Sequence, residues 1–293
     1  MRIFVTGATG FVGSAVVQEL LGAGHQVLGL VRSDASAAKL AATGAEMLRG
    51  ELADLDSLRR GAGSADGVIH TAFIHDFSNF EESCRIESLA VEAMAGVLEG
   101  SRRPMLICSG TGLLPPGKLA TEQDTHASPF PRVISEKTAE AAAARGALVS
   151  VVRLPPTVHG AGDHGFVPIL IETARQKGVA AYVGDGSNCW PAVHRLDAAR
   201  LFRLAIEKGL GGVRYHAVAE QGVPFRDIAA AIGRGLGVPV VSKSPEEAAG
   251  HFGWFAHFTG LDNRASSAWT RETLDWAPTQ PELLTDLETA YFR

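Results

Sequence analysis

Hydrophobic and polar positions in the first half of the chain follow two periods, one typical of buried strands and one typical of helices. Residues 3–5 form an apolar run suited to a strand buried on both faces, and a run of helical spacing begins at Val16. A second apolar run covers residues 26–31. Residues 1–33 therefore predict a strand, a glycine-containing turn, a helix and a second strand.

The same alternation continues as far as Arg153. Helices are expected over residues 35–43, 54–60, 79–99 and 135–145, strands over 45–49, 66–72, 105–108 and 148–153, and a polar loop over 114–131. Strands that alternate with helices predict an α/β fold with a doubly wound parallel sheet, in which ligands bind at the carboxyl ends of the strands.

After Arg153 the pattern changes to turns and short extended pieces. A helix over 197–208, a strand over 212–218, and a helix from Pro224 to Gly237 are expected further on. These features predict a dinucleotide-binding type of domain over residues 1–153, rejoined at about 196–220. A smaller C-terminal substrate lobe is expected over 154–195 and 221–293.

Composition limits the kinds of binding partner and the cellular location that we expect for the protein. The 293 residues carry a net charge of −5 without a basic block, which argues against nucleic acid and against an anionic membrane surface. Since no apolar run is long enough for a membrane span and the opening strand does not have the order of a signal peptide, a cytoplasmic protein is expected. The expected partner is a small-molecule substrate, no metal site is predicted, and the oligomeric state stays open, a homodimer included.

Three glycines stand between the first strand and the first helix, in Thr6-Gly-Ala-Thr-Gly-Phe-Val-Gly13. Gly7 allows a sharp turn, Gly10 allows backbone N–H groups to approach a pyrophosphate, and Gly13 allows the helix to pack closely on the strand. Glycines also occur in ordinary turns, but the position between strand and helix favours a dinucleotide site.

The spacing Gly-x-x-Gly-x-x-Gly resembles the extended and atypical short-chain dehydrogenase/reductases, which include NAD-dependent epimerases and dehydratases. The resemblance covers nearly the whole chain and implies a Rossmann fold with a nicotinamide cofactor. Glu51-Leu52 stands where the family has Asp-Leu against the adenine, although a surface position is the alternative for Glu51. The resemblance implies cofactor contacts from Gly7, Thr9, Gly10, Phe11, Val12, Gly13, Glu51, Leu52, His70, Thr71, Ala72, Pro155 and Val158.

Arg32 bears on the choice of cofactor. An NAD-type acid would stand at or near Val31, yet no carboxylate is present there, and Arg32 can pair with a 2′-phosphate. We therefore expect NADP(H) to be favoured over NAD(H). The alternative is that Arg32 is a solvated surface charge.

The catalytic positions are where the chain departs from the family. The family uses Tyr-x-x-x-Lys, and aligning the chain on this motif puts Val133 at the Tyr position and Lys137 at the Lys position. Lys137 is then expected to hold the nicotinamide ribose, with a surface lysine as the alternative. Ser109 or Thr111 is expected to reach the substrate unless its hydroxyl only bonds backbone. His159, His164 and Tyr182 are the candidates for the missing proton donor, beside Lys137 itself or a water molecule.

Two functions remain open at this point. The first is an atypical NAD(P)-dependent oxidoreductase acting on a small carbonyl or alcohol, or using its cofactor transiently as epimerases and dehydratases do. The second is a redox sensor that binds NAD(P) without strong turnover, which the absent tyrosine favours.

Overall fold

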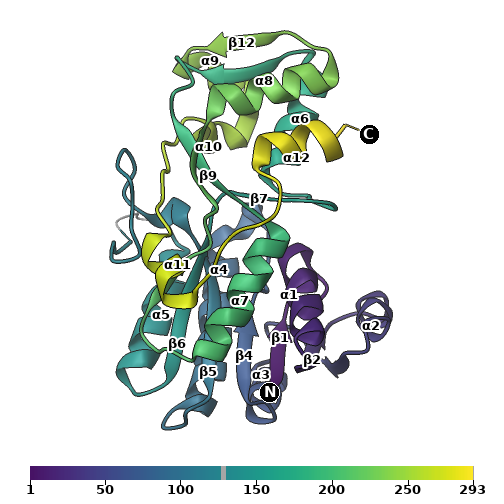
Figure 1. Ribbon diagram of the computed structural model, residues 1–293, viewed down its shortest axis with the longest axis vertical. Helices are drawn as coiled ribbons and strands as arrows, with labels where there is room; N and C mark the ends of the chain where they lie inside the picture. The colour runs from purple at the N-terminus through teal and green to yellow at the C-terminus, as the bar shows by residue number, and fades with distance from the viewer. Residues whose placement is uncertain (127–129, 293) are drawn as a thin grey trace.

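The computed structural model describes residues 1–126 and 130–292, and its centre is a seven-stranded sheet in the order β10-β6-β5-β4-β1-β2-β3 (Figure 1). Its strands are β1 (Arg2–Thr6), β2 (Gln26–Val31), β3 (Glu46–Arg49), β4 (Gly67–His70), β5 (Pro104–Gly110), β6 (Leu148–Leu154) and β10 (Arg214–His216). All neighbouring strands run parallel. The predicted α/β fold with a doubly wound parallel sheet is confirmed.

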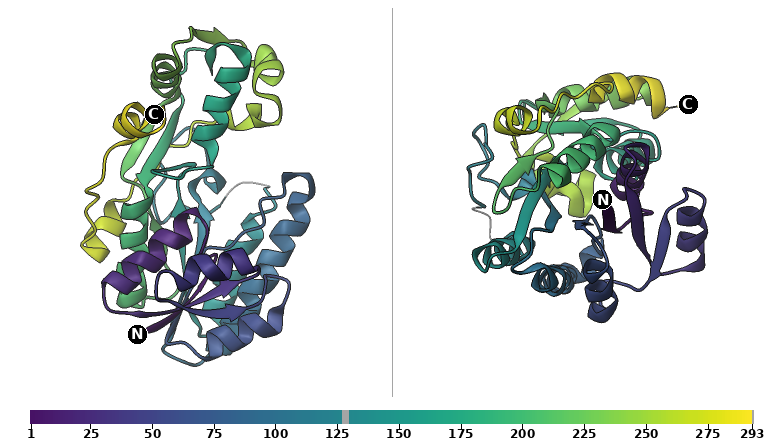
Figure 2. Two further views of the ribbon diagram at one scale, coloured as in Figure 1. Left: turned by 90° about the vertical axis from the view of Figure 1, so that its right-hand side faces the viewer. Right: turned by 60° about the horizontal axis from the view of Figure 1, so that its bottom comes forward.

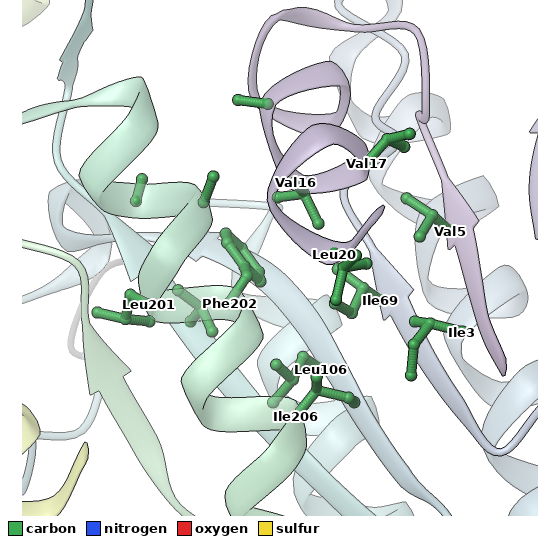
Figure 3. Packing of buried hydrophobic residues seen from close by; sticks show 14 of the residues in the cluster. Ile3, Val5, Val16, Val17, Leu20, Ile69, Leu106, Leu201, Phe202 and Ile206 are labelled. Carbon is green, nitrogen blue, oxygen red and sulfur yellow. The ribbon is translucent and has the colours of Figure 1, made fainter. Parts of the chain in front are cut away.

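Helices cover both faces of this sheet, and each uses the apolar stripe that the sequence shows. One face carries α1 (Phe11–Gly22) and α7 (Arg195–Lys208), and the other carries α3 (Leu55–Gly63), α4 (Phe80–Leu98) and α5 (Val133–Ala144). The helix α2 (Asp34–Ala41) lies beside β2 and β3. Figure 3 shows Val16 and Leu20 of α1 and Phe202 of α7 packed over Ile3 and Ile69 of the strands.

A second lobe lies beyond the carboxyl ends of the sheet, as Figures 1 and 2 show. Its strands form a three-stranded sheet, β11-β9-β7, and a two-stranded sheet, β12-β8. Its elements are β7 (Thr157–His159), α6 (Phe166–Lys177), β8 (Ala180–Val183), β9 (Cys189–His194), β11 (Glu220–Pro224), α8 (Phe225–Leu236), β12 (Val240–Lys243), α9 (Pro245–Phe252), α10 (Ala256–Thr259) and α12 (Leu283–Ala290). Trp190, Phe225 and Phe255 are buried at its centre.

Two stretches differ from what the sequence pattern predicted. Residues 166–177 form the helix α6, where only turns and short extended pieces were expected, because Val167, Leu170 and Ala174 bury one helical face in the second lobe. The helix α11 (Ala268–Leu274) lies in the stretch assigned to the substrate lobe, yet its end and Trp276 pack into the core beside α7. The Trp276 indole donates a hydrogen bond to the Asp197 carbonyl (3.0 Å).

Short 3₁₀ turns complete the chain: η1 (Phe77–Asn79), η2 (Thr111–Leu113) and η3 (Gly253–Phe255). Of the loop expected over 114–131, residues 127–129 lie outside the described part; the rest forms no strand or helix except an isolated bridge at Ala120. Within the described residues, no helix is long and apolar enough to cross a membrane.

Candidate functional site

The turn between β1 and α1 contains glycines at positions where an added side chain would overlap neighbouring atoms. Gly7 has a φ of 69°, and a Cβ there would lie 2.8 Å from the Ala72 nitrogen and 2.8 Å from the Thr71 hydroxyl. A Cβ on Gly13 would overlap the Gly7 carbonyl. Gly13 therefore fixes the close contact between turn and helix, as the sequence predicted.

Gly10 differs from the other two because it faces outward. It is exposed, it forms the N-terminal boundary of α1, and its own Cβ would meet only the Gly7 carbonyl oxygen, at 3.2 Å. Among the described residues no side chain caps this helix, and its first turn holds no acidic residue. The uncapped N–H groups and the positive end of the helix dipole therefore fit a pyrophosphate, which supplies acceptors and negative charge.

The segment after β4 closes over this turn. The Thr71 hydroxyl donates to the Thr6 carbonyl (2.9 Å), and the Ala72 N–H lies near the Thr6 hydroxyl (3.4 Å). His70 is fully buried, and its Nδ1 lies 2.7 Å from the Thr6 hydroxyl. Its ring therefore ties β4 to β1 rather than projecting toward a ligand. Burial, and secondarily the charge of Arg132, lower the pKa of His70 to about 3.

The ends of β2 and β3 carry the residues expected at the adenosine half. Arg32 is exposed, and the next residue, Ser33, caps α2 through a bond from the Ser36 N–H to its hydroxyl (3.2 Å). Arg49, opposite Val31 in the β2–β3 register, forms an ion pair with Asp34. Glu51 is exposed, whereas Leu52 is buried.

The start of α5 carries the positions expected for the family's Tyr and Lys. Val133 is buried and Lys137 is exposed. Residues four apart lie only about 40° apart around a helix, so both positions belong to one side of α5. The expected contact of Lys137 with the nicotinamide ribose stays a prediction, with a surface lysine as the alternative. At the neighbouring positions, Arg132 pairs with Glu87 of α4, and Glu136 pairs with Arg153 of β6.

Glu136 forms a fully buried ion pair with Arg153 of β6. Arg153 donates through Nη2 to Oε2 (2.7 Å) and through Nε to Oε1 (3.0 Å), and the Ser109 hydroxyl also donates to Oε1 (2.6 Å). Burial alone would raise the pKa of Glu136, but the bonds from Arg153 and Ser109 outweigh it and hold the pKa below its ordinary value. Ser109 is thus bound to this pair rather than to open space.

The other candidate hydroxyl is also bound inside the protein. Thr111 is fully buried and donates to the side chain of Asn263 (2.7 Å), which in turn donates to the Thr111 carbonyl (2.8 Å). The expectation that Ser109 or Thr111 reaches a substrate is not supported by these contacts. The alternative, a hydroxyl that only bonds backbone, does not describe them either, because the partners of the two hydroxyls are the side chains of Glu136 and Asn263.

The three candidate proton donors lie in three different places. His159 belongs to β7 and is fully buried, with Nδ1 2.8 Å from the Asp286 carboxylate of α12, so it is not a loop residue open to a ligand. Tyr182 belongs to β8 and packs against the core of the second lobe. His164 is exposed and packs edge-on to Phe11, with ring centroids 5.7 Å apart. Only His164 of the three is both accessible and beside the glycine turn.

Pro155 and Val158 lie where the chain passes from β6 into β7. Pro155 is buried, and Val158 is half-buried and pairs with Val193 of β9. They therefore stand at the junction of the sheet and the second lobe, and the cofactor contact that the resemblance implies for them stays a prediction.

Arg132 was not singled out from the sequence. Its guanidinium lies 3.9 Å from the centre of the Phe73 ring, and its Nη2 donates to the buried Glu87 of α4 at 3.3 Å. Burial, and secondarily the charge of Arg132, lower the pKa of His75. These contacts place Arg132 at the carboxyl end of β4. The sequence signal that could have drawn attention to Arg132 is its i, i+4 spacing from Glu136.

Comparison with known proteins agrees with this geometry. The sequence profile of the NAD dependent epimerase/dehydratase family matches residues 3–218. The chain belongs to this family. Its members are NAD-dependent oxidoreductases of the extended short-chain type, and the fold and the glycine turn above are the features that this chain shares with them.

Individual relatives give less detail. An uncharacterized protein of Schizosaccharomyces pombe is 53% identical over 100% of both chains. A 4-hydroxy-2-methyl-3-oxo-4-farnesyl-3,4-dihydroquinoline-1-oxide ketoreductase of Stigmatella aurantiaca is 28% identical over 73% of this chain and 67% of its own. The solved structure of the dTDP-glucose 4,6-dehydratase DesIV from Streptomyces venezuelae, with NAD and TYD bound, matches with a TM-score of 0.79 at 19% identity, covering 98% of this chain and 95% of that chain. This last likeness concerns the fold.

Proposed function

We propose that the protein is an NADP(H)-dependent oxidoreductase that acts on a small carbonyl or alcohol, directly or through transient oxidation as in epimerases and dehydratases. The observation that carries the proposal is the exposed, uncapped N-terminus of α1 at Gly10, next to the turn where Thr71 and Ala72 lie against Gly7. The backbone N–H groups of Phe11 and Val12 would bind the pyrophosphate there. When bound, the nicotinamide would supply or accept a hydride.

The preference for NADP(H) is supported by charges at the end of the sheet. Arg32 is exposed directly after β2, and Ser33 supplies a hydroxyl beside it. The nearest acid, Asp34, is paired with Arg49. A 2′-phosphate would therefore meet a guanidinium, a bond worth about 1.5 to 3 kcal/mol, or roughly ten- to a hundredfold in affinity.

His164 is the group that we propose as proton donor or acceptor. It is exposed beside Phe11, with the two ring centroids 5.7 Å apart, and Phe11 begins the helix α1 at the glycine turn. A histidine is suited to this task because its unperturbed pKa lies near neutral pH. It would replace the tyrosine that the family uses, whereas His159 is held by Asp286.

The test is steady-state oxidation of NADPH with a panel of aldehydes and ketones, compared with NADH at equal concentration. Turnover with NADPH, lowered by about 10² in His164→Asn and unchanged in the control variant His25→Asn, whose ring bonds Glu207 at the amino end of the sheet, is the expected result. Full activity in His164→Asn would refute its role, and equal affinities for the two cofactors would refute the preference for NADP(H).

A second candidate, a sensor that binds NADP(H) without turnover, is favoured by one observation. The groups nearest to the family's catalytic positions, Ser109 and Glu136, are committed to the buried pair with Arg153. Tight NADPH binding with no turnover on any carbonyl of the panel would select the sensor and exclude the enzyme.

A further inference from the structure

Six aromatic side chains from distant parts of the sequence meet where the carboxyl end of the sheet approaches the second lobe. We call this group the aromatic bridge; it consists of Phe73, Phe77, Phe80, Phe130, Trp254 and Phe258. The rings of Phe77 and Trp254 lie 4.9 Å apart, although one belongs to η1 and the other to η3. The bridge therefore joins the segment after β4 to the C-terminal half of the chain.

The outer part of the aromatic bridge is exposed to solvent. Phe77 is 44% exposed and Trp254 is 56% exposed, although both are large and apolar. Isolated exposed apolar residues are ordinary, but these two are in contact with each other and continuous with the half-buried Phe80 and Phe258. A contiguous apolar surface of flat rings is suited to a planar ligand, since rings prefer stacked or edge-on contact with other rings.

Arg132 places positive charge at the inner end of the aromatic bridge. Its guanidinium is stacked on Phe73, and its Nε is buried without a hydrogen-bond partner among the described residues. Its one acid partner, Glu87, lies 3.3 Å away and also accepts from the Ser135 hydroxyl at 2.6 Å. A guanidinium has five N–H donors in a planar fork that matches a carboxylate, so donors remain for a ligand.

We propose that Arg132 and the aromatic bridge bind a planar aromatic carboxylate, with the carboxylate on the guanidinium and the ring against Phe77 and Trp254. The inference names the substrate class of the oxidoreductase proposed above and rests on it: the substrate would be an aromatic acid that also carries the reacting carbonyl or alcohol. Charge complementarity selects this ligand, because a neutral aromatic compound would leave the Arg132 donors unused.

Continuity with the cofactor site supports the same assignment. Phe73 follows Ala72, whose nitrogen lies against the Gly7 position of the glycine turn. The Phe73 ring, on which Arg132 is stacked, also contacts His75 (ring centroids 5.1 Å apart), and His164 lies beside Phe11 at the glycine turn. A ligand held by Arg132 would therefore lie beside the segment that closes over this turn.

The test is calorimetric binding of trans-cinnamate, a planar aromatic carboxylate that cannot be reduced at a carbonyl, to the full-length protein with NADP⁺ present. Two comparison ligands separate charge from shape: cinnamamide has the same plane without the charge, and 3-cyclohexylpropanoate has the charge without the aromatic ring. We expect cinnamate to bind at least tenfold more tightly than either ligand.

Variants then assign the contacts. Arg132→Met should weaken cinnamate binding about ten- to a hundredfold, and Trp254→Ala should weaken it roughly three- to tenfold. Arg85→Met, at an exposed arginine of α4 paired with Glu82, and Leu196→Ala, at an exposed apolar residue of α7, are the matched controls and should bind as the unmodified protein does. If Arg132→Met does not fold, Trp254→Ala and the ligand comparison decide.

Binding of NADPH, measured in the same proteins, separates the two levels of the proposal. Unchanged cinnamate affinity in Trp254→Ala or Arg132→Met, equal binding of cinnamamide, or no cinnamate binding at all would overturn the inference while NADPH still binds. If the unmodified protein does not bind NADPH, the proposed function itself is overturned.

Discussion

The buried pair of Glu136 and Arg153 gives a sharp prediction about stability. Both side chains are fully buried, so Glu136→Gln leaves the Arg153 guanidinium charged inside the protein with no carboxylate. Removing one partner of a buried ion pair typically costs about 3 to 5 kcal/mol, because the remaining charge stays desolvated. We expect Glu136→Gln to lose stability in this range, a large share of the roughly 5 to 15 kcal/mol that holds a domain folded.

The double variant Glu136→Gln with Arg153→Met separates the pair from its surroundings. It removes both charges, so it should be more stable than Glu136→Gln alone, even though the Asp124 carbonyl loses the bond from Arg153 Nη1 (2.8 Å). The single variants would then be non-additive by at least about 1 kcal/mol. Arg145→Met, at an exposed arginine paired with Glu92 and Glu99, is the control and should cost about 0.5 kcal/mol or less.

Urea unfolding followed by circular dichroism measures these differences. With a slope of about 3 kcal/mol per molar urea, a loss of about 4 kcal/mol lowers the midpoint by roughly 1.3 M. Because the pKa of Glu136 is depressed in the folded protein, its contribution is complete above the unfolded pKa of about 4.3 and is lost as the pH falls through the folded pKa. A midpoint for Glu136→Gln within about 0.2 M of the unmodified protein at pH 7 would refute the reasoning.

Three further predictions concern the cofactor site and its surroundings. Lys137→Met should weaken NADPH binding, because an exposed ammonium donor to the nicotinamide ribose is lost; unchanged affinity by calorimetry would show that Lys137 is a surface lysine. Arg32→Ala should weaken NADPH binding about ten- to a hundredfold and leave NADH binding nearly unchanged, and an equal loss for both cofactors would contradict a 2′-phosphate contact. His70→Gln should flatten the loss of stability on acidification: the buried ring has a pKa of about 3, so the unfolded chain takes up the proton first and stability falls by roughly 1.4 kcal/mol per pH unit between about 6.5 and 3. An unchanged slope in urea unfolding across that pH range would show that His70 is not held neutral.

The elements of the central sheet could be predicted because their signals are local. The run Ile3–Val5 and the apolar stripe from Val16 are each contained in a short stretch of the chain. Hydrophobic period and turn residues are therefore sufficient to predict the strand and the helix. The helix α6 was missed because its apolar positions stand among glycines and prolines that are typical of loops. The position of α11 depends on contacts such as that of Trp276 with Asp197, 79 residues away in the sequence. Hydrophobic periodicity carries no information about such contacts.

The part of the candidate site that could be predicted is the glycine turn, where backbone groups form the binding surface. Gly7, Gly10 and Gly13 have the expected arrangement because glycine spacing fixes a turn directly. On α5, Lys137 is exposed and its contact with the nicotinamide ribose stays a prediction, whereas the adjacent Glu136, 100° around the helix, faces the sheet and pairs with Arg153. The partners of His159 and Ser109 could not be inferred, since Asp286 and Glu136 are distant from them in sequence.

Calorimetric titration of NADPH into the unmodified protein and into Gly10→Val tests the central claim most directly. Gly10 is exposed at the N-terminus of α1, where a valine side chain would stand in the path of the pyrophosphate and its Cβ would meet only the Gly7 carbonyl oxygen, at 3.2 Å. Gly63→Ala, where a Cβ meets only a Val97 methyl at 3.7 Å, is the control for replacing a glycine. We predict saturable NADPH binding to the unmodified protein and to Gly63→Ala, and none to a folded Gly10→Val. Equal NADPH affinity in Gly10→Val would contradict a dinucleotide bound over the first helix.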